Sequence, residues 1–130
     1  MKKRILIVDD NPAIIYSVKN GLEEEYDDID VRGVEGGKKC FDYLTNEGKP
    51  DLILLDIMMP DINGWDVYAT LQEKEEWKEI PIVFLTAKTD GYSKGFGKLV
   101  CADYIEKPFS IEDLKNRIDV VLKKRENNGK

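Results

Sequence analysis

Short apolar runs alternate along this chain with longer stretches in which apolar residues recur every three or four positions. The apolar runs, which indicate strands, lie at residues 4–8, 30–34, 50–56, 81–87 and 103–106. The amphipathic stretches, which indicate helices, lie at residues 10–26, 36–48, 64–80 and 110–128. A glycine-bearing segment lies between the last two strands, where the alternation predicts one more helix, the fourth of five. Five strands and five helices in alternation predict right-handed crossovers and a parallel sheet with helices on both faces.

Local signals mark the ends of the first and last helices. Asn11 or Asp10 can cap the first helix, and Pro12 suits its first position. Ser110 and Asp113 resemble a capping box at the start of the last helix. These signals support both helix assignments without reference to the apolar pattern.

The alternation continues without a break that would indicate a second domain, an internal repeat or a low-complexity segment. We therefore expect one domain over residues 1–124 and a polar tail or truncated linker over residues 125–130. A chain of 130 residues suffices to bury about two-thirds of its unfolded surface.

Composition and charge exclude several function classes. A hydrophobic fraction of 42% is too high for a disordered chain, and a net charge of −6 argues against a nucleic-acid binder, whose phosphate contacts need a basic face. No apolar run approaches the roughly 18 to 20 residues of a membrane span. The apolar part of the basic start is too short for a signal peptide. We therefore expect a cytoplasmic protein whose domain contacts neither nucleic acid nor membrane.

The chain contains two cysteines and no histidine. Cys40 and Cys101 are too few for a disulfide framework and lack the spacing of a zinc site, so we expect small buried thiols. Without histidine, neither a Ser-His-Asp or Cys-His catalytic group nor an imidazole metal ligand can form. Any chemistry must therefore depend on carboxylates, hydroxyls and lysines.

Polar residues gather where the predicted strands end. Asp9 and Asp10 follow the first strand, and Asp56 ends the third. Thr86 lies at the end of the fourth strand and Lys107 at the end of the fifth. In open parallel sheets, ligands bind beyond the carboxyl ends of the strands. These five residues are therefore predicted to meet at one edge of the sheet.

Three carboxylates crowded at this edge are unfavourable, so either some of them are protonated or a cation lies among them. At about 4 Å and an effective dielectric constant near 20, each pair of like charges repels by roughly 4 kcal/mol. Mg²⁺ fits, because proteins hold it through one or two carboxylates, a phosphate oxygen and retained waters. Asp10 would bind the metal, and Asp9 would assist directly or through a water.

The same residues supply the parts of a phosphoryl-transfer site. The Asp56 carboxylate can act as a covalent nucleophile that forms an aspartyl phosphate. Lys107 would pair with one phosphoryl oxygen and the Thr86 hydroxyl would donate to another. The metal would offset the repulsion between the acceptor and an anionic donor.

Four segments resemble the receiver domains of two-component response regulators: ILIVDD, DLILLDIMMPDINGWD, PIVFLTAK and ADYIEKPF. They occur in the family's order and at close to its spacing, and the likeness covers nearly the whole chain. It implies a flavodoxin-like, doubly wound five-stranded sheet of strand order 2-1-3-4-5 with five helices. It also implies that Asp56 is the phosphoacceptor and that Asp10, Asp56 and the Met58 backbone carbonyl hold Mg²⁺, or alternatively Mn²⁺.

The resemblance assigns further roles around this site. Asp9 would support the metal site, and Lys107 would contact the phosphoryl group. The peptide between Lys107 and Pro108 matches a step that is usually cis in the family. Thr86 would be the switch hydroxyl, and Tyr104 the aromatic that turns inward when this hydroxyl moves to the phosphoryl group.

Two positions implied by the resemblance bear on the lifetime of the phosphoryl group. Met58 and Lys88 flank the path of the attacking water, and the apolar Met58 is expected to hinder it. A histidine kinase or a histidine phosphotransfer protein would supply the phosphoryl group, because this chain has no histidine. A downstream protein would receive the signal. The domain would catalyse its own Mg²⁺-dependent phosphotransfer and slow autodephosphorylation, while acting mainly as a switch.

The glycine-bearing segment departs from the family pattern. Gly91, Gly95 and Gly97 would each cost about 1 kcal/mol relative to alanine inside a helix. The segment is also about one residue short, and Cys101 stands where the family usually has glycine. We expect a short, mobile or displaced fourth helix, which would alter a surface that many receivers use for dimerisation or output.

Plainer interpretations exist for single residues. Asp9 and Asp10 could cap a helix, although one cap does not explain two acids beside Asp56. Lys107, Thr86 and Tyr104 could be an ordinary surface lysine, strand former and half-buried aromatic. The segment DINGWD fails as a calcium loop, because Met59 and Thr70 stand at required ligand positions. We interpret it as a turn in which Gly64 adopts a backbone conformation that other residues avoid.

Two rival functions use similar residues. A haloacid-dehalogenase-type phosphatase also has an aspartate nucleophile, but it needs a second aspartate where Met58 stands. A pseudo-receiver, which is never phosphorylated and acts as a binding scaffold, is the alternative function. The full set of acids, hydroxyl and lysine argues against it, and the unusual fourth-helix segment argues mildly for it.

Overall fold

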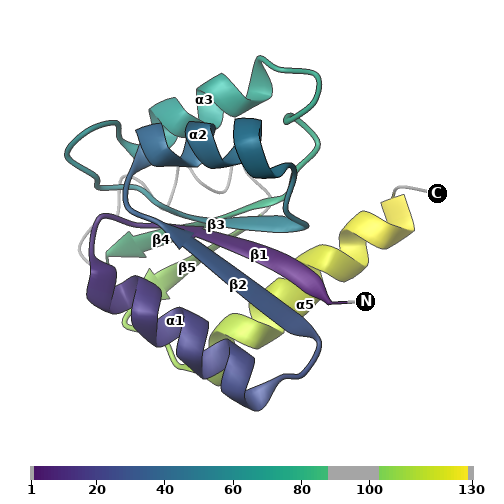
Figure 1. Ribbon diagram of the computed structural model, residues 1–130. Coiled ribbons are helices and arrows are strands. Elements are labelled where there is room, and N and C mark those ends of the chain that lie inside the picture. The colour runs from purple at the N-terminus through teal and green to yellow at the C-terminus, as the bar shows by residue number, and fades with distance from the viewer. Residues whose placement is uncertain (1, 88–102, 129–130) are drawn as a thin grey trace.

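Five parallel strands form one sheet of order β2-β1-β3-β4-β5 in the computed structural model, which describes residues 2–87 and 103–128. The strands are β1 (Lys3–Val8), β2 (Ile29–Val34), β3 (Leu52–Asp56), β4 (Ile82–Ala87) and β5 (Asp103–Lys107). The described helices are α1 (Pro12–Glu25), α2 (Gly37–Glu47), α3 (Gly64–Gln72) and α5 (Ile111–Asn128). Helices α1 and α5 cover one face of the sheet, and α2 and α3 cover the other (Figure 1). The predicted flavodoxin-like sheet and its strand order are confirmed.

The predicted fourth helix falls within residues 88–102, which lie outside the described residues. The expectations for Lys88, Cys101 and the three glycines of this segment therefore stay predictions. At the other end of the chain, α5 continues to Asn128, past residue 124 where the compact domain was expected to end. Among the described helices, none combines the length and the apolar character that a membrane span requires.

The two layers of the core meet across β1. Ile5 and Ile7 belong to the core on the side of α1 and α5, whereas Leu6 and Val8 belong to the core on the side of α2 and α3. All four side chains are fully buried, because both faces of a central parallel strand are covered. Each such side chain contributes roughly 1.5–3 kcal/mol on burial, which explains the unbroken apolar run.

The helix-capping predictions agree with the contacts. Asn11 is the N-cap of α1, with Pro12 at the first position, and its side chain accepts the Ala13 N–H at 2.9 Å. At the start of α5, the Ser110 hydroxyl accepts the Asp113 N–H at 3.0 Å. Of the two cap candidates for α1, the structure selects Asn11.

Helix α3 is shorter than predicted: it ends at Gln72, and the chain to residue 80 forms turns. Residues 72–76 read QEKEE, so they offer no apolar side chain that could hold another helical turn against the sheet. Trp77 then turns inward and stacks on Phe41 of α2, with ring centroids 6.3 Å apart. Burial of this indole outweighs continuation of the helix.

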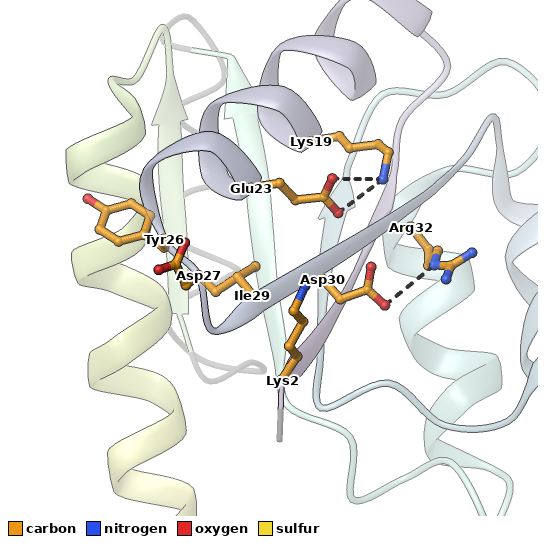
Figure 2. Close-up of a pocket in the computed structure, with 8 residues that line it drawn as sticks. All are labelled: Lys2, Lys19, Glu23, Tyr26, Asp27, Ile29, Asp30 and Arg32. Atoms are coloured by element: carbon orange, nitrogen blue, oxygen red, sulfur yellow. Dashed lines mark hydrogen bonds and ion pairs between the residues drawn. The ribbon is translucent and has the colours of Figure 1, made fainter.

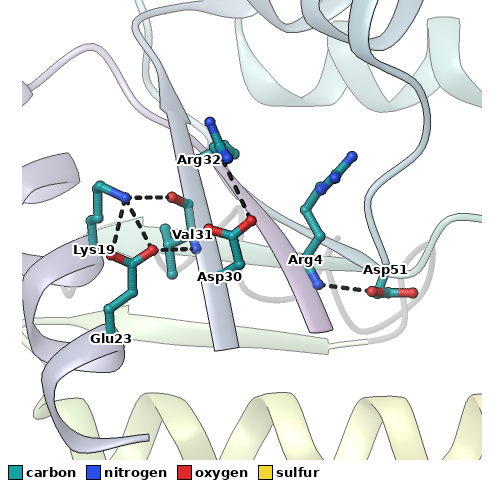
Figure 3. A network of polar contacts seen from close by, with 7 residues as sticks. All are labelled: Arg4, Lys19, Glu23, Asp30, Val31, Arg32 and Asp51. Carbon is teal, nitrogen blue, oxygen red and sulfur yellow. Dashed lines mark hydrogen bonds and ion pairs between the residues drawn. The ribbon is translucent and has the colours of Figure 1, made fainter. Parts of the chain in front are cut away.

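Strand β2 lies at the edge of the sheet, and α1 covers its outer side with an ion pair. Lys19 Nζ is 3.0 Å from both Glu23 carboxylate oxygens (Figure 3). Lys19 also donates to the Val31 carbonyl at 2.9 Å, and Glu23 accepts the Val31 N–H at 2.7 Å. Unpaired backbone groups on an edge strand invite pairing with another chain. The two side chains satisfy both backbone groups of Val31 and so block such pairing there.

We expect Glu23→Gln to lower the free energy of unfolding by about 1 kcal/mol at pH 7, because a charged acceptor strengthens both contacts. Burial acts to raise the pKa of Glu23, but the Val31 N–H and the Lys19 ammonium lower it below its ordinary value of 4.5. The unfolded carboxyl therefore takes up its proton first as the pH falls. The stabilising effect is full above pH 4.5 and is lost as the pH drops through the folded pKa. Urea unfolding of both proteins between pH 7 and pH 3 measures the difference.

Asp30→Asn is the matched control for this experiment. Asp30 pairs with Arg32 at 3.6 Å on the exposed side of the same strand (Figure 3). Exposed ion pairs contribute about 0–1 kcal/mol, so this variant should stay close to the wild type across the pH range. A stability difference for Glu23→Gln that is as large at pH 3 as at pH 7 would contradict the expectation.

Candidate functional site

Three aspartates meet at the carboxyl ends of β1 and β3. Carboxylate oxygens of Asp9, Asp10 and Asp56 all lie within 4.8 Å of one another. Val8 and Leu55 are neighbours in the strand register, so β1 and β3 deliver these acids at the same level. Asp9 and Asp56 are buried, at 1% and 5% exposure, whereas Asp10 is exposed. The structure thus brings together the three acids that the sequence placed at one edge.

Lys107 reaches this cluster from the end of β5. Its Nζ lies 3.0 Å from Asp9 Oδ2 and 3.3 Å from Asp56 Oδ1. Burial disfavours the ammonium, but the hydrogen bond to Asp9 and the charges of both carboxylates outweigh this and raise the pKa of Lys107. The lysine is therefore held in its charged form beside the acids. The Lys107–Pro108 peptide is cis, as predicted.

The pKa of Asp56 is raised well above its ordinary value. Burial and the charge of Asp9 raise the pKa of Asp56 to about 7, while Lys107 acts to lower it. One ammonium faces three carboxylates, so the site carries an excess of negative charge. Like charges and burial both disfavour an ionised carboxylate, and a cation reverses this.

The donor set fits a hard divalent cation. Mg²⁺ takes oxygen ligands, commonly one or two carboxylates, and keeps several waters. Two buried carboxylates supply fixed oxygens, and the exposed Asp10 leaves access to water. Met58 lies two residues after Asp56, in the turn that leads to α3, and is 68% exposed. That the Met58 backbone carbonyl binds the metal stays a prediction.

The two predicted switch residues lie on the neighbouring strands. Thr86 is 1% exposed, next in β4 to Leu85, which is the register partner of Asp56. Its hydroxyl donates to the Ala87 carbonyl at 3.3 Å. Tyr104 of β5 is half-buried and packs against the core on the side of α2 and α3. Thr86 therefore lies between the strands of the acceptor and the lysine, while the switching roles stay predictions.

Gly64 departs from its predicted role. Among the described residues, positive φ angles occur at Gly36 and Gly48, so the expectation of an unusual backbone at Gly64 was wrong. Gly64 is needed instead for close approach: a Cβ there would lie 2.5 Å from the Asp56 carbonyl oxygen and 2.8 Å from Ile57 Cα. Its N–H donates to the Ile57 carbonyl at 2.7 Å, which holds the turn after Asp56 against the start of α3.

Asp61 is a residue that the sequence reasoning missed. Its carboxylate accepts the N–H of Gly37 at 3.3 Å and that of Lys38 at 3.1 Å, at the start of α2. Burial acts to raise the pKa of Asp61, but backbone hydrogen bonds, that of Lys38 first, lower it, so the group is ionised at neutral pH. One signal in the sequence was available: Gly36 precedes α2 and has no side chain with which to cap it.

Besides the acidic cluster, a polar hollow lies at the opposite end of the sheet (Figure 2). It has a volume of about 590 Å³ and is lined by Lys2, Lys19, Glu23, Tyr26, Asp27, Ile29, Asp30 and Arg32. Two ion pairs, Lys19 with Glu23 and Asp30 with Arg32, already join members of this lining. Positive and negative side chains both line this hollow and pair with one another, so the lining favours no particular class of ligand. The acidic cluster is therefore the better candidate for a functional site.

Comparison with known proteins identifies similar chains and a matching family. Residues 5–119 match the family described as response regulator receiver domain. PilH of Pseudomonas aeruginosa is 36% identical over 120 residues, which cover 92% of this chain and 97% of PilH. The transcriptional regulatory protein PhoP of Bacillus subtilis is 35% identical over 127 residues, which cover 97% of this chain and 51% of PhoP. The chain spans about half or less of the length of several curated relatives.

A solved structure agrees with the fold as well. The receiver domain of the Francisella response regulator 1452 is 30% identical, with a TM-score of 0.81 over 95% of this chain and 98% of that chain. The family match extends from β1 into α5 and so includes the acidic cluster and Lys107. The chain belongs to the response regulator receiver domain family of two-component systems.

Proposed function

We propose that this receiver domain is a phosphorylation-dependent switch in a phosphorelay, with Asp56 as the phosphoacceptor. One observation carries the proposal: the buried Asp56 carboxylate lies within 4.8 Å of two further carboxylates, and 3.3 Å from the Lys107 ammonium. This arrangement combines a fixed nucleophile, ligands for a cation and a positive side chain for phosphoryl oxygens.

The transfer itself is a substitution at phosphorus. An Asp56 oxygen forms a bond to phosphorus as the P–N bond of a partner's phosphohistidine breaks, and the leaving imidazole keeps the electron pair and takes up a proton. Asp10, Asp56 and the Met58 carbonyl would hold Mg²⁺, which would supply positive charge to offset the repulsion between donor and acceptor. Asp9 supports this site from the buried side. The chain has no histidine of its own, so the proposed physiological donor is the phosphohistidine of a histidine kinase or a phosphotransfer protein.

The remaining residues convert the new charge into a change of shape. Lys107 exchanges a contact with Asp56 for one with a phosphoryl oxygen, and the Thr86 hydroxyl donates to another. Movement of Thr86 frees space towards which the half-buried Tyr104 turns. The phosphoryl group thereby shifts the populations of two conformations, one of which binds a downstream protein.

Met58 and Lys88 are proposed to set how long the signal lasts. Met58 is 68% exposed two residues after the acceptor, so its apolar side chain is in contact with solvent. Attack by water would restore Asp56, and an apolar group in its path slows that attack. In this sense the domain catalyses its own phosphotransfer and slow dephosphorylation, although its role is regulatory. A cytoplasmic location fits this role and stays a prediction.

Mg²⁺ at about ten times its Kd is expected to raise the free energy of unfolding by about 1.4 kcal/mol, which corresponds to a rise in Tm of about 5 °C. Asp10→Asn should lose most of this rise, because it removes one proposed ligand from the acidic cluster. Thermal unfolding with and without Mg²⁺, at constant ionic strength, measures the effect.

Glu75→Gln is the matched control, since it removes an equal charge from an exposed residue that pairs with Lys78 at 3.1 Å. It should keep the full Mg²⁺ response. If Mg²⁺ left the wild-type Tm unchanged, the proposed metal site would be wrong and the scaffold alternative would be favoured.

A further inference from the structure

Asp61 caps a helix from a distant part of the chain. Its carboxylate accepts the N–H groups of Gly37 and Lys38, and it lies 24 residues after Gly37. The first N–H groups of a helix have no partner within the helix, and a side chain of the preceding residue usually satisfies one or two of them. Here the preceding residue is Gly36, so Asp61 supplies the cap from the loop between β3 and α3.

The start of α2 is shaped to receive this loop. Gly36 has a φ of +116°, and a Cβ there would lie 2.9 Å from Asp61 Oδ2. A Cβ at Gly37 would lie 3.1 Å from Ile62 Cβ and 2.7 Å from Val67 Cγ2. The two glycines let residues 61 and 62 lie directly on the helix. The contact therefore combines two hydrogen bonds with close packing.

The loop that Asp61 holds is the loop that leaves the acceptor. Residues 57–63 connect Asp56 to α3 and include Met58, whose carbonyl is a proposed metal ligand. Both ends of the loop are held by hydrogen bonds: Gly64 N–H donates to the Ile57 carbonyl at 2.7 Å, and the Asn63 side-chain oxygen caps α3 by accepting the Asp66 N–H at 2.9 Å. Between these ends, Met58 and Pro60 are exposed to solvent, whereas Met59 is buried in the core on the side of α2 and α3.

We propose that Asp61 is a positioning residue for the metal: by capping α2, it holds the loop in the conformation that offers the Met58 carbonyl to Mg²⁺. The inference rests on the proposed function, because it assumes that this loop contributes a metal ligand. A loop that is released from α2 samples other conformations, and the apparent affinity falls with the fraction that is competent to bind. Because coupling is reciprocal, bound Mg²⁺ also strengthens the contact between Asp61 and α2.

Asp61→Ala is expected to weaken Mg²⁺ binding by up to about fivefold, because the loss of an N-cap shifts the equilibrium between held and released loop by about this factor and the apparent Kd rises as the held fraction falls. Asp61→Asn keeps an oxygen acceptor but removes the charge, so it should weaken binding less than about twofold. Isothermal titration calorimetry at constant ionic strength gives the three Kd values. The pair of variants separates capping from the general attraction between Asp61 and a cation.

Asp51→Ala is the control for lost stability. Asp51 also joins two distant segments by a carboxylate–backbone bond, from Arg4 N–H at 2.8 Å, but at the amino end of β3 (Figure 3). It should destabilise the fold without changing the Kd for Mg²⁺. Amide hydrogen exchange provides a second measurement: Mg²⁺ should slow exchange at Lys38 in the wild type and in Asp51→Ala, and leave it unchanged in Asp61→Ala.

Three results would count against the inference. Equal weakening by Asp61→Ala and Asp61→Asn would assign the effect to charge and overturn the capping role. An unchanged Kd in Asp61→Ala would overturn the inference and leave the proposed function standing. Absence of Mg²⁺ binding by the wild type would overturn the proposed function, and the positioning role with it.

Discussion

Asp56→Asn is expected to abolish the uptake of a phosphoryl group. After incubation with acetyl phosphate and Mg²⁺, the wild type should gain about 80 Da, the mass of one phosphoryl group, and the variant should gain nothing. An amide oxygen carries no negative charge and is a poor nucleophile towards phosphorus. Asp56 is buried at the end of β3, so the strand fixes the position of this carboxylate. Intact-mass spectrometry measures the result directly.

The substitution should leave the fold intact, so the loss can be assigned to chemistry. Asparagine has nearly the shape of aspartate, and burial together with the Asp9 charge already disfavours ionised Asp56. Removal of that charge should not lower the free energy of unfolding, because the raised pKa marks the ionised form as unfavourable and Lys107 keeps its ion pair with Asp9 at 3.0 Å. Asp51→Asn, the same change at the other end of β3, serves as the matched control and should gain mass as the wild type does.

Mass gain by Asp56→Asn equal to that of the wild type would show that the acceptor has been misassigned. Acetyl phosphate is a small donor, so a wild type that gains no mass should be tested with a phosphohistidine donor as well. If neither donor modifies the wild type and Mg²⁺ does not bind, the binding-scaffold alternative replaces the switch.

Gly64→Ala is expected to lower the free energy of unfolding by about 3 kcal/mol, one of the largest effects available from a single methyl group. The new Cβ would lie 2.5 Å from the Asp56 carbonyl oxygen and 2.8 Å from Ile57 Cα, and backbone atoms cannot rotate away as a flexible side chain can. Relief of the clash would stretch the bond between Gly64 N–H and the Ile57 carbonyl. Urea unfolding monitored by circular dichroism measures the loss.

Gly48→Ala separates steric conflict from the general cost of replacing glycine. Gly48 has a φ of +93°, and no described atom lies within 4 Å of the added methyl group. Backbone strain alone should cost about 1 kcal/mol. Equal losses in the two variants would contradict the proposed close approach. Displacement of the Asp56 turn should also weaken Mg²⁺ binding in Gly64→Ala and leave it unchanged in Gly48→Ala.

The gathering of the site residues could be predicted because each one follows a strand that the apolar pattern reveals. Parallel strands end at the same edge, so Asp9, Asp56 and Lys107 had to approach one another once the sheet formed. The capping of α1 by Asn11 was equally accessible, because the cap and its partner are two residues apart. Local patterns and strand direction suffice for predictions of this kind.

Features that depend on distant partners were not predictable in the same way. The end of α3 depends on Trp77, which leaves the helical path to stack on Phe41 of another helix. The need for glycine at position 64 depends on how closely α3 approaches Asp56, and no pattern within the segment shows that distance. The cap from Asp61 joins residues 24 positions apart.

The sequence by itself determined the alternation of strands and helices, the sheet that follows from it, and the chemistry at the carboxyl ends of the strands. These follow from periodicity and from residue types, which act over a few neighbouring positions. Only the tertiary structure decided which groups of other elements these side chains contact: Lys107 lies between Asp9 and Asp56, Lys19 and Glu23 bond the backbone of Val31 in β2, and Asp61 accepts from the start of α2. Such contacts depend on distances of a few ångströms between segments that are far apart in the chain, and those distances are set when the helices pack on the sheet.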